Sequence, residues 1–309
     1  MIKDFISIGD FTGVQLAGLL KQALADKALF RAGSLPASLP RKTLAMIFEK
    51  PSLRTRVSFQ TAMTQLGGSA IHLTQADIGL GSREAVQDVA RVLGRMCDGV
   101  MARTFSHEWV QQLAAHCPRA VINALTDYSH PCQAMADLMT AQERFGALAG
   151  RTLAFIGDGN NVARSLAMAC TRLGMHFVLA APAGYELEKS LAASLPSGAG
   201  AGSFQMVRDP LKAVAKADVV YTDTWVSMGQ EKQKAKRAKA FANFQVNAKL
   251  MAAAPPSAVV MHCLPAYRDY EITDEVFEAH AGIILEEAEN RLHFQRTLLN
   301  VLIGQGGIP

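Results

Sequence analysis

The sequence predicts an α/β protein of two domains, and three observations support this prediction. The chain has 309 residues, half of them hydrophobic, which is more than one compact domain usually holds. Short apolar runs alternate with helical patterns along its whole length. These runs are continuously apolar rather than alternating, as expected of parallel strands that are buried on both faces of a sheet.

Two series of expected strands follow one another along the chain. The first series comprises residues 43–48, 70–73, 99–103 and 120–123. The second comprises residues 152–157, 176–181, 204–207, 218–223 and 258–263. Helical patterns lie between the strands, for example over residues 54–66 and 161–173. Small residues interrupt the pattern over residues 145–151, so a domain boundary is expected there, with domains of residues 1–147 and 148–309.

Composition and charge argue against several other classes of protein. The net charge of +4 is too small to imply a nucleic-acid partner, and the basic run at residues 232–239 is interpreted as a solvated helix face. Five cysteines without regular spacing do not make a disulfide framework, and no CxxC or HExxH pattern indicates a metal. The sequence shows no signal-peptide region and no apolar run of the roughly 18 residues that a membrane helix needs. A soluble, cytoplasmic protein with no membrane or nucleic-acid partner is expected.

The first candidate site lies just after the expected strand at residues 43–48, in the stretch PSLRTRVSF. Ser52 is a natural N-cap for a helix that begins near Leu53. The first turn of a helix offers N–H groups and a positive dipole end, to which Arg54 and Thr55 add a guanidinium and a hydroxyl. This combination favours a site for phosphate or a similar dianion. The alternative is an ordinary helix cap with surface arginines.

Three further motifs stand at the ends of expected strands, where open α/β sheets bind ligands. His130 and Gln133, in HPCQAMAD, offer neutral hydrogen bonds suited to a carbonyl and an amide, although a structural His-Pro before a helix is the alternative. Asp223, in DTWVSMG, offers a partner for an ammonium group, although by itself it is better explained as the cap of a turn. His262 and Cys263, in HCLP, are adjacent and therefore unsuited to ligating one metal together, and the sequence shows no base that would activate the thiol.

A fifth motif, GDGNNV at residues 157–162, follows an expected strand and opens a helix, as dinucleotide-binding loops do. Val162 replaces the third glycine of that fingerprint, and residues 179–182 carry no acidic residue that would hold a ribose. A nucleotide site, and with it an oxidoreductase, is therefore not expected.

The motifs FEKPSLRTR, HPCQAMAD, DTWVSMG and HCLP, together with GDGNNVA and ENRLH, resemble the aspartate/ornithine carbamoyltransferase family over nearly the whole chain. The Ser-x-Arg-Thr-Arg and His-Pro-x-Gln motifs are common to that family. The Ser-Met-Gly and His-Cys-Leu-Pro motifs resemble its ornithine branch, because an aspartate-specific member would be expected to carry Pro-Leu-Pro-Arg near Cys263.

The resemblance implies two similar α/β domains, each a parallel sheet flanked by helices, the first binding carbamoyl phosphate and the second L-ornithine. The last helix, at about residues 290–304, would pack back on the first domain, and the subunits would form homotrimers or multiples of trimers. The implied reaction transfers the carbamoyl group to the δ-amine of ornithine, giving citrulline and phosphate, without a cofactor or metal. A carbamoyltransferase for an acylated ornithine or another amine is the alternative, as is a non-catalytic binding protein. The direction, toward arginine synthesis or arginine breakdown, stays open.

The resemblance also implies which residues form the site. The carbamoyl-phosphate ligands would be Ser52, Leu53 through its N–H, Arg54, Thr55, Arg103, His130, Gln133, Cys263, Leu264 and Arg291. The ornithine ligands would be Asn161, Asp223, Ser227 and Met228. Among these, Arg103, His130 and Cys263 would be catalytic, whereas Arg56 would be mainly structural.

One position departs from the family pattern. Gly79 stands where the family often has a glutamine that a neighbouring subunit lends to carbamoyl phosphate. A glycine has no side chain for that contact, so a neighbour such as Arg83 would have to replace it.

Overall fold

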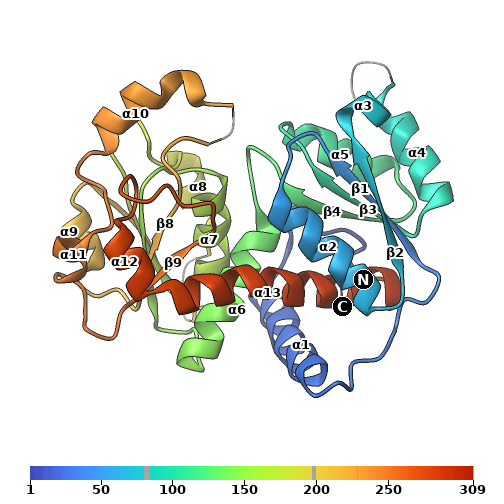
Figure 1. The fold of residues 1–309 in the computed structure, drawn as a ribbon, viewed down its shortest axis with the longest axis horizontal. Helices are drawn as coiled ribbons and strands as arrows, with labels where there is room; N and C mark the ends of the chain where they lie inside the picture. Colours follow the sequence, from blue (N-terminus) through green and yellow to red (C-terminus); the bar gives the residue numbers. More distant parts are fainter. Residues whose placement is uncertain (80–83, 197–199, 228, 309) are drawn as a thin grey trace. The chain divides into compact units, whose positions relative to one another are not determined.

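The computed structural model describes residues 1–79, 84–196, 200–227 and 229–308. The chain forms two compact units, one of Met1–Met139 with Glu289–Pro309 and one of Thr140–Ala288 (Figure 1). Each unit contains one parallel sheet with helices packed against it, so the predicted α/β class with two sheets is confirmed. The C-terminal residues return to the first unit, as the resemblance implied.

The sheet of the first unit has four strands in the order β2-β1-β3-β4, and neighbouring strands are parallel. They are β1 (Thr43–Phe48), β2 (Ser69–Thr74), β3 (Gly99–Arg103) and β4 (Ala120–Leu125). The inner strand β3 is buried throughout, as its unbroken apolar pattern predicts, whereas the edge strand β2 is partly exposed. The helices are α1 (Gly13–Arg31), α2 (Leu53–Gln65), α3 (Gln75–Ile78), α4 (Val86–Met96), α5 (His107–His116) and α6 (Pro131–Phe145), after a 3-10 turn at Ile8–Asp10. Helix α6 continues into the second unit.

The sheet of the second unit has five parallel strands in the order β7-β6-β5-β8-β9. They are β5 (Thr152–Ile156), β6 (His176–Ala180), β7 (Phe204–Val207), β8 (Val219–Thr222) and β9 (Val259–His262). The helices are α7 (Asn161–Arg172), α8 (Lys189–Ser194), α9 (Pro210–Val214), α10 (Lys234–Phe241), α11 (Ala248–Met251) and α12 (Asp274–Ala279). Helix α13 (Ala281–Leu299) begins in this unit, ends in the first and is followed by a helical turn at Asn300–Gly304. The strand order reverses between β5 and β8, which is where doubly wound sheets bind their ligands.

Local contacts set the strand ends in the second unit. Gly157 turns the chain directly after β5 with a φ of 147°, a conformation that favours glycine, so β5 is one residue shorter than expected. Asp218, expected as a strand residue, instead accepts a hydrogen bond from the Thr152 N–H at 2.9 Å and pairs with Arg151. These contacts join the start of β5 to the residue before β8.

Each sheet buries its own apolar core. The core of the first unit includes Ala45, Ile47, Val89, Val100, Val110 and Val121, and that of the second includes Ile156, Val220, Trp225, Phe241, Val260 and Ile284. Among the described residues, none of the helices combines the length and hydropathy that crossing a membrane requires.

The basic run at residues 232–239 is a solvated face, as predicted, with the exception of one arginine. Its lysines are exposed, on a 3-10 turn at Glu231–Gln233 and on α10. Arg237 is buried, because its guanidinium pairs with Asp158 and donates to the carbonyl oxygen of Trp225. One arginine of the run therefore fastens α10 to the loops at the carboxyl edge of the sheet.

Candidate functional site

In the first unit, the turn between β1 and α2 folds as the sequence predicts. Ser52 is the N-cap of α2, because its hydroxyl accepts a hydrogen bond from the Thr55 N–H at 3.3 Å. The same hydroxyl donates to Thr55 Oγ1 at 3.1 Å. Leu53 and Arg54 form the start of the helix, where backbone N–H groups face the helix end. The side chain of Leu53 is exposed and that of Arg54 is half-buried, so Leu53 would contribute through its backbone.

Two guanidinium groups from distant parts of the sequence meet at Thr55. Arg291 Nη2 donates to Thr55 Oγ1 at 2.9 Å, and Arg103 Nη1 donates to the same oxygen at 3.5 Å. Arg103 ends β3 and is 9% exposed, and Arg291 lies in α13 and is 3% exposed. Two buried like charges repel each other, and a bound dianion would offset this repulsion. We call Ser52, Thr55, Arg103, His130 and Arg291 the Thr55 cluster.

His130 belongs to this cluster as a neutral imidazole. It directly precedes α6 and is buried. Burial lowers the pKa of His130 well below its ordinary value, and the charges of Arg291, Arg103 and Lys50 lower it further. His130 therefore offers a hydrogen bond at neutral pH without adding a third buried positive charge to the two arginines.

The first turn of α6 supplies the other side chains of the HPCQ motif. Gln133 is buried, and its backbone N–H donates to the His130 carbonyl oxygen at 3.1 Å. Its side-chain Nε2 donates to Asp137 Oδ1 at 2.7 Å. Burial raises the pKa of the Cys132 thiol to about 12, so this cysteine stays protonated and unreactive.

Lys50 is a buried cation that was not among the predicted site residues. Its ammonium group pairs with Asp127 and lies 3.9 Å from the centre of the Phe105 ring. Its charge contributes to the lowered pKa of His130. The signal in the sequence was its place in FEKPSLRTR, two residues after β1 ends.

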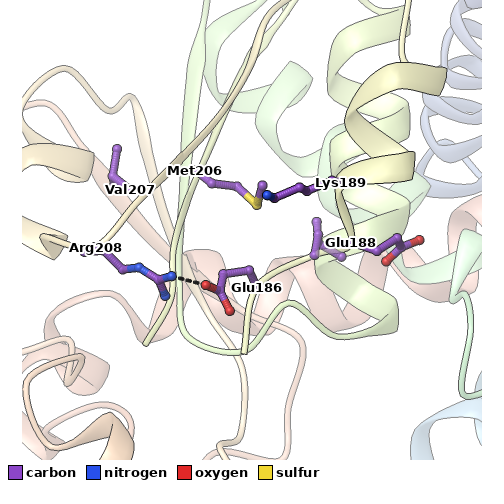
Figure 2. Close-up of a pocket in the computed structure, with 7 residues that line it drawn as sticks. Glu186, Glu188, Lys189, Met206, Val207 and Arg208 are labelled. Atoms are coloured by element: carbon purple, nitrogen blue, oxygen red, sulfur yellow. Dashed lines mark hydrogen bonds and ion pairs between the residues drawn. The ribbon is translucent and has the colours of Figure 1, made fainter. Parts of the chain in front are cut away.

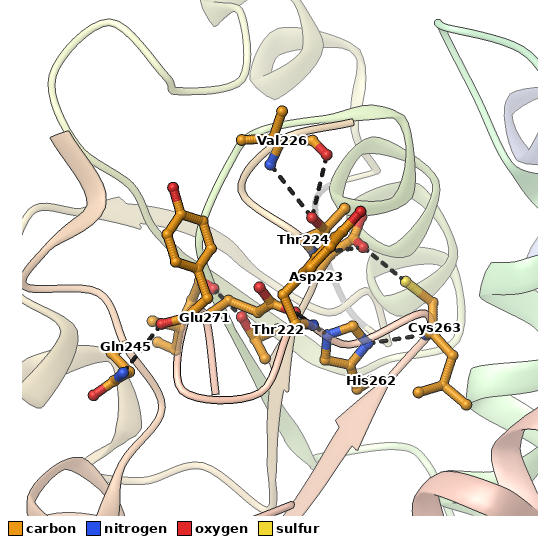
Figure 3. A network of polar contacts seen from close by, with 12 residues as sticks. Thr222, Asp223, Thr224, Val226, Gln245, His262, Cys263 and Glu271 are labelled. Atoms are coloured by element: carbon orange, nitrogen blue, oxygen red, sulfur yellow. Dashed lines mark hydrogen bonds and ion pairs between the residues drawn. The ribbon is translucent and has the colours of Figure 1, made fainter. Parts of the chain in front are cut away.

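In the second unit, the carboxyl ends of β8 and β9 bring Asp223 and Cys263 together. Thr222 and His262 end these strands and are register partners, so the residues that follow them are neighbours. Cys263 Sγ donates to Asp223 Oδ1 at 3.0 Å (Figure 3). The Thr224 N–H donates to the same carboxylate oxygen at 2.7 Å. Asp223 therefore caps a turn, as its alternative explanation predicts, and it is also a buried carboxylate at a strand end.

Asn160 binds the other oxygen of this carboxylate and was not among the predicted residues. Its Nδ2 donates to Asp223 Oδ2 at 2.7 Å, while its Oδ1 caps α7 by accepting from the N–H groups of Val162 and Ala163, each at 3.0 Å. The predicted ligand, Asn161, is the next residue and is partly exposed. An asparagine before a helix is typical of an N-cap, and this was the signal for Asn160. We call Asn160, Asp223 and Cys263 the Asp223 cluster.

His262 supports the loop that carries Cys263 and Leu264. It is fully buried, and its Nδ1 accepts a hydrogen bond from the Leu264 N–H at 2.9 Å. Its Nε2 lies 3.1 Å from Glu271 Oε1 (Figure 3). Because Nδ1 accepts, Nε2 carries the proton and donates to Glu271. His262 therefore fixes the course of the loop rather than facing a ligand.

Two predicted ligands belong to the segment after Asp223. The Ser227 N–H donates to Gln230 Oε1 at 3.3 Å, and the residue is partly buried. Met228 lies outside the described residues. The roles of both stay predictions, as do contacts of Cys263 and Leu264 with a carbamoyl group, since these two residues lie in the second unit and the Thr55 cluster lies in the first.

Gly79 has a structural explanation of its own. It ends α3 with a left-handed backbone, φ 61°, and its N–H donates to the Gln75 carbonyl oxygen at 2.8 Å. Side chains are disfavoured in this conformation, which accounts for a glycine here. Arg83, the suggested replacement for the missing glutamine, lies outside the described residues.

The GDGNNV loop does not have the geometry of a dinucleotide site. The Gly159 N–H donates to the Tyr185 carbonyl oxygen at 2.8 Å, and a Cβ on Gly159 would lie 2.5 Å from the Leu187 nitrogen. The glycine thus allows the protein's own chain to pack where dinucleotide folds place the pyrophosphate. Burial raises the pKa of Asp158 in this loop, while its ion pair with Arg237 acts against that rise.

A surface hollow near the ends of β6 and β7 is separate from the Asp223 cluster. It is lined by Glu186, Leu187, Glu188, Lys189, Met206, Val207 and Arg208 (Figure 2). Arg208 pairs with Glu186, and Glu188 pairs with Arg164. Glu186, Glu188 and Arg208 in its wall are therefore paired within the protein, and the hollow contains none of the predicted ligands.

Replacing His130 with glutamine is expected to make the free energy of unfolding less dependent on pH. In the folded protein the lowered pKa keeps His130 neutral, whereas in the unfolded chain the imidazole gains a proton below its ordinary pKa of about 6.5. The unfolded state then binds more protons. The contribution of His130 to stability is therefore complete above about pH 6.5 and is lost as pH falls toward the lowered folded pKa.

Urea unfolding of both proteins at pH values from about 7.5 to 5.5 measures this difference. The slopes of free energy against pH should differ by up to about 1.4 kcal/mol per pH unit, the effect of one proton. Parallel curves for the wild type and His130→Gln would mean that the pKa of His130 is the same in the folded and the unfolded protein.

Comparisons with known proteins agree with the motifs and the geometry. Residues 3–143 match the family model described as aspartate/ornithine carbamoyltransferase, carbamoyl-P binding domain, and residues 149–302 match the corresponding Asp/Orn binding domain. An ornithine carbamoyltransferase of Symbiobacterium thermophilum is 46% identical over 303 residues, covering 97% of this chain and 98% of the relative. An anabolic ornithine carbamoyltransferase of Pyrococcus furiosus is 45% identical over 304 residues, covering 98% and 96%.

The fold is shared with solved structures that carry the same name. The ornithine carbamoyltransferase structure from Pyrococcus furiosus superposes with a TM-score of 0.94 at 45% identity, covering 99% of this chain and 98% of that one. Both family models together span nearly the whole chain, one on each side of residues 144–148. The chain therefore belongs to the aspartate/ornithine carbamoyltransferase family.

Proposed function

We propose that this protein transfers the carbamoyl group of carbamoyl phosphate to the δ-amine of L-ornithine, giving L-citrulline and phosphate. The observation that favours ornithine over aspartate is the Asp223 cluster. A buried carboxylate at a strand end is suited to an ammonium group, whereas the second carboxylate of aspartate would be repelled by it. The aspartate branch of the family is therefore disfavoured by charge.

The Thr55 cluster suits the carbamoyl-phosphate half of this reaction. The first turn of α2, Arg54, Arg103 and Arg291 would hold the phosphate group with N–H groups and guanidinium charges. Neutral His130 would donate to the carbonyl oxygen, and Gln133 would bind the carbamoyl amide. Cys263 and Leu264 would contact the carbamoyl group and the ornithine side chain.

The Asp223 cluster suits the ornithine half. Asp223 and Ser227 would bind the α-ammonium group, and Asn161 with the Met228 N–H would bind the α-carboxylate. An acylated ornithine has no α-ammonium group, so a carboxylate at this position gives it no charge-assisted bond. This supports free ornithine over the acylated alternative.

The chemistry then needs positioning and charge stabilisation. The neutral δ-amine attacks the carbamoyl carbon, a C–N bond forms, the C–O bond to phosphate breaks, and the amine loses a proton. Negative charge grows on the carbonyl oxygen and on the leaving phosphate, where arginines and a helix N-terminus stabilise it. A carbamoylated Cys263 is not required, because the amine reaches citrulline in this single displacement.

Citrulline formation from carbamoyl phosphate and L-ornithine tests the proposal. A panel of Nα-acetylornithine, L-lysine and L-aspartate measures the choice of amine. We expect L-ornithine to be preferred in kcat/KM by at least about 100-fold, since each rival lacks a matched charge or length. A preference for Nα-acetylornithine would support the acylated alternative, and binding without turnover would indicate a non-catalytic protein.

We further propose that the protein acts in the cytoplasm as a homotrimer and serves arginine synthesis. The Pyrococcus furiosus relative that is 45% identical is named anabolic, which supports the synthetic direction. Light scattering should give about three times the mass of the 33.2 kDa chain or a multiple of that, whereas a monomer mass would contradict the assembly.

A further inference from the structure

Asp137 is a fully buried acid in the HPCQAMAD motif to which the proposed function assigns no contact with substrate. It lies four residues after Gln133 on α6, so both side chains share one face of the helix. Gln133 is 1% exposed, and its Nε2 donates to Asp137 Oδ1 at 2.7 Å. The pair is therefore held together away from water, where a hydrogen bond is stronger than in solvent.

The chemistry of this pair fixes which way the glutamine amide faces. In the observed geometry the Asp137 carboxyl oxygen is the acceptor and the Gln133 NH2 group is the donor. Gln133 must therefore turn its NH2 group toward Asp137, and its planar amide then presents the carbonyl Oε1 on the other side. Without the carboxylate, the amide could rotate by a half-turn and present NH2 instead.

We propose that Asp137 is a positioning residue that makes the site specific for a carbamoyl group by holding Gln133 as a hydrogen-bond acceptor. This inference rests on the proposed function. An acceptor oxygen recognises the NH2 group of carbamoyl phosphate. It forms no hydrogen bond with the methyl group of acetyl phosphate. Acetyl phosphate has nearly the same shape as carbamoyl phosphate and carries the same phosphate group. Asp137 thus affects the selectivity between two acyl phosphates, whereas the Thr55 cluster would bind the phosphate group that both contain.

The test compares three ligands, carbamoyl phosphate, acetyl phosphate and inorganic phosphate, by calorimetry on the wild type and on Asp137→Asn. Asparagine has the size of aspartate but both donates and accepts, so it no longer fixes the amide. We expect the variant to lose about tenfold or more in affinity for carbamoyl phosphate and to keep its affinities for the other two ligands within about twofold. An equal loss for all three ligands would overturn the proposal in favour of a structural role.

Gln133→Ala provides the matched background. Because Asp137 acts through Gln133, Asp137→Asn should cause no further loss of carbamoyl-phosphate affinity in a Gln133→Ala protein. Additive losses in the double variant would contradict the proposal. If Asp137→Asn does not fold, Gln133→Leu decides: the preference for carbamoyl over acetyl phosphate should fall at least about tenfold, and a retained preference would refute the role of the amide.

The wild type separates this inference from the function on which it rests. If the wild-type protein neither binds carbamoyl phosphate nor forms citrulline, the proposed function is wrong before any variant is made. If the wild type does both and Asp137→Asn keeps the full preference for carbamoyl over acetyl phosphate, only the role of Asp137 is wrong.

Discussion

Replacing Arg54 with alanine should lower kcat/KM for carbamoyl phosphate by about thirtyfold to a thousandfold. Arg54 lies in the first turn of α2, beside Thr55, on which two further guanidinium groups converge. In the proposed site its removal would take away a charge-assisted bond to phosphate, which corresponds to about 2–4 kcal/mol of transition-state stabilisation. Steady-state kinetics with carbamoyl phosphate varied at saturating ornithine measures the loss.

Arg56→Ala is the matched control, two residues further along the same helix. The Arg56 side chain is exposed. The pKa of His72 on β2 is lowered first by the partial burial of His72 and second by the charge of Arg56. Its charge therefore acts next to the edge strand, and kcat/KM should stay within about threefold of the wild type. Near-normal kinetics of a folded Arg54→Ala protein, or an equal loss in both variants, would remove Arg54 from the phosphate site.

The strands were predictable because their apolar runs are unbroken. Residues 43–48 and 99–103 become β1 and β3 with the expected bounds, since a continuous apolar run is typical of a parallel strand that is buried on both faces. Helix α2 was predictable from Ser52, whose hydroxyl makes the expected cap. Patterns of this kind depend only on neighbours in the sequence, which is why they can be read from it.

The contacts that assemble the two clusters depend on distant residues and could not be derived from local patterns. Arg291 reaches Thr55 across 236 positions of the chain, and Cys263 reaches Asp223 across 40. The family resemblance named these residues, but the sequence alone could not show that they converge on one hydroxyl and one carboxylate. The register of β8 and β9 brings Cys263 next to Asp223, and the path of α13 brings Arg291 next to Thr55.

The residues that the sequence motifs did not indicate are residues that support other side chains of the site. Lys50, Asn160 and Asp137 each bind a side chain of the site or alter its electrostatics, and a residue of this kind has no distinctive motif. Asn160 illustrates the difficulty, because its sequence context indicates an ordinary helix cap. The structure shows that one amide does both tasks, with Oδ1 on the helix and Nδ2 on Asp223.

Asp223→Asn should raise the KM for ornithine by about 100-fold and leave the affinity for carbamoyl phosphate within about twofold. In the proposed site the neutral amide would lose the charge attraction to the α-ammonium group, a loss of about 3 kcal/mol for a buried pair. Asparagine can still accept from the Thr224 N–H, so the turn after β8 keeps its cap. Kinetics with ornithine varied, and calorimetry with carbamoyl phosphate alone, measure the two effects.

The control for this variant is the same substitution elsewhere in the second unit. Asp209 caps α9 by accepting from the Leu211 N–H at 3.0 Å, and asparagine is an equally good N-cap, so Asp209→Asn should leave both measurements unchanged. Asp223→Asn also sets a new NH2 group against either the Asn160 amide or the Cys263 thiol, both of which donate to the native carboxylate. A thermal unfolding scan therefore accompanies the kinetics. Equal weakening of both substrates, together with a lower melting temperature, would identify Asp223 as a support for the loops. Selective weakening of ornithine at an unchanged melting temperature would identify it as the ligand of the α-ammonium group.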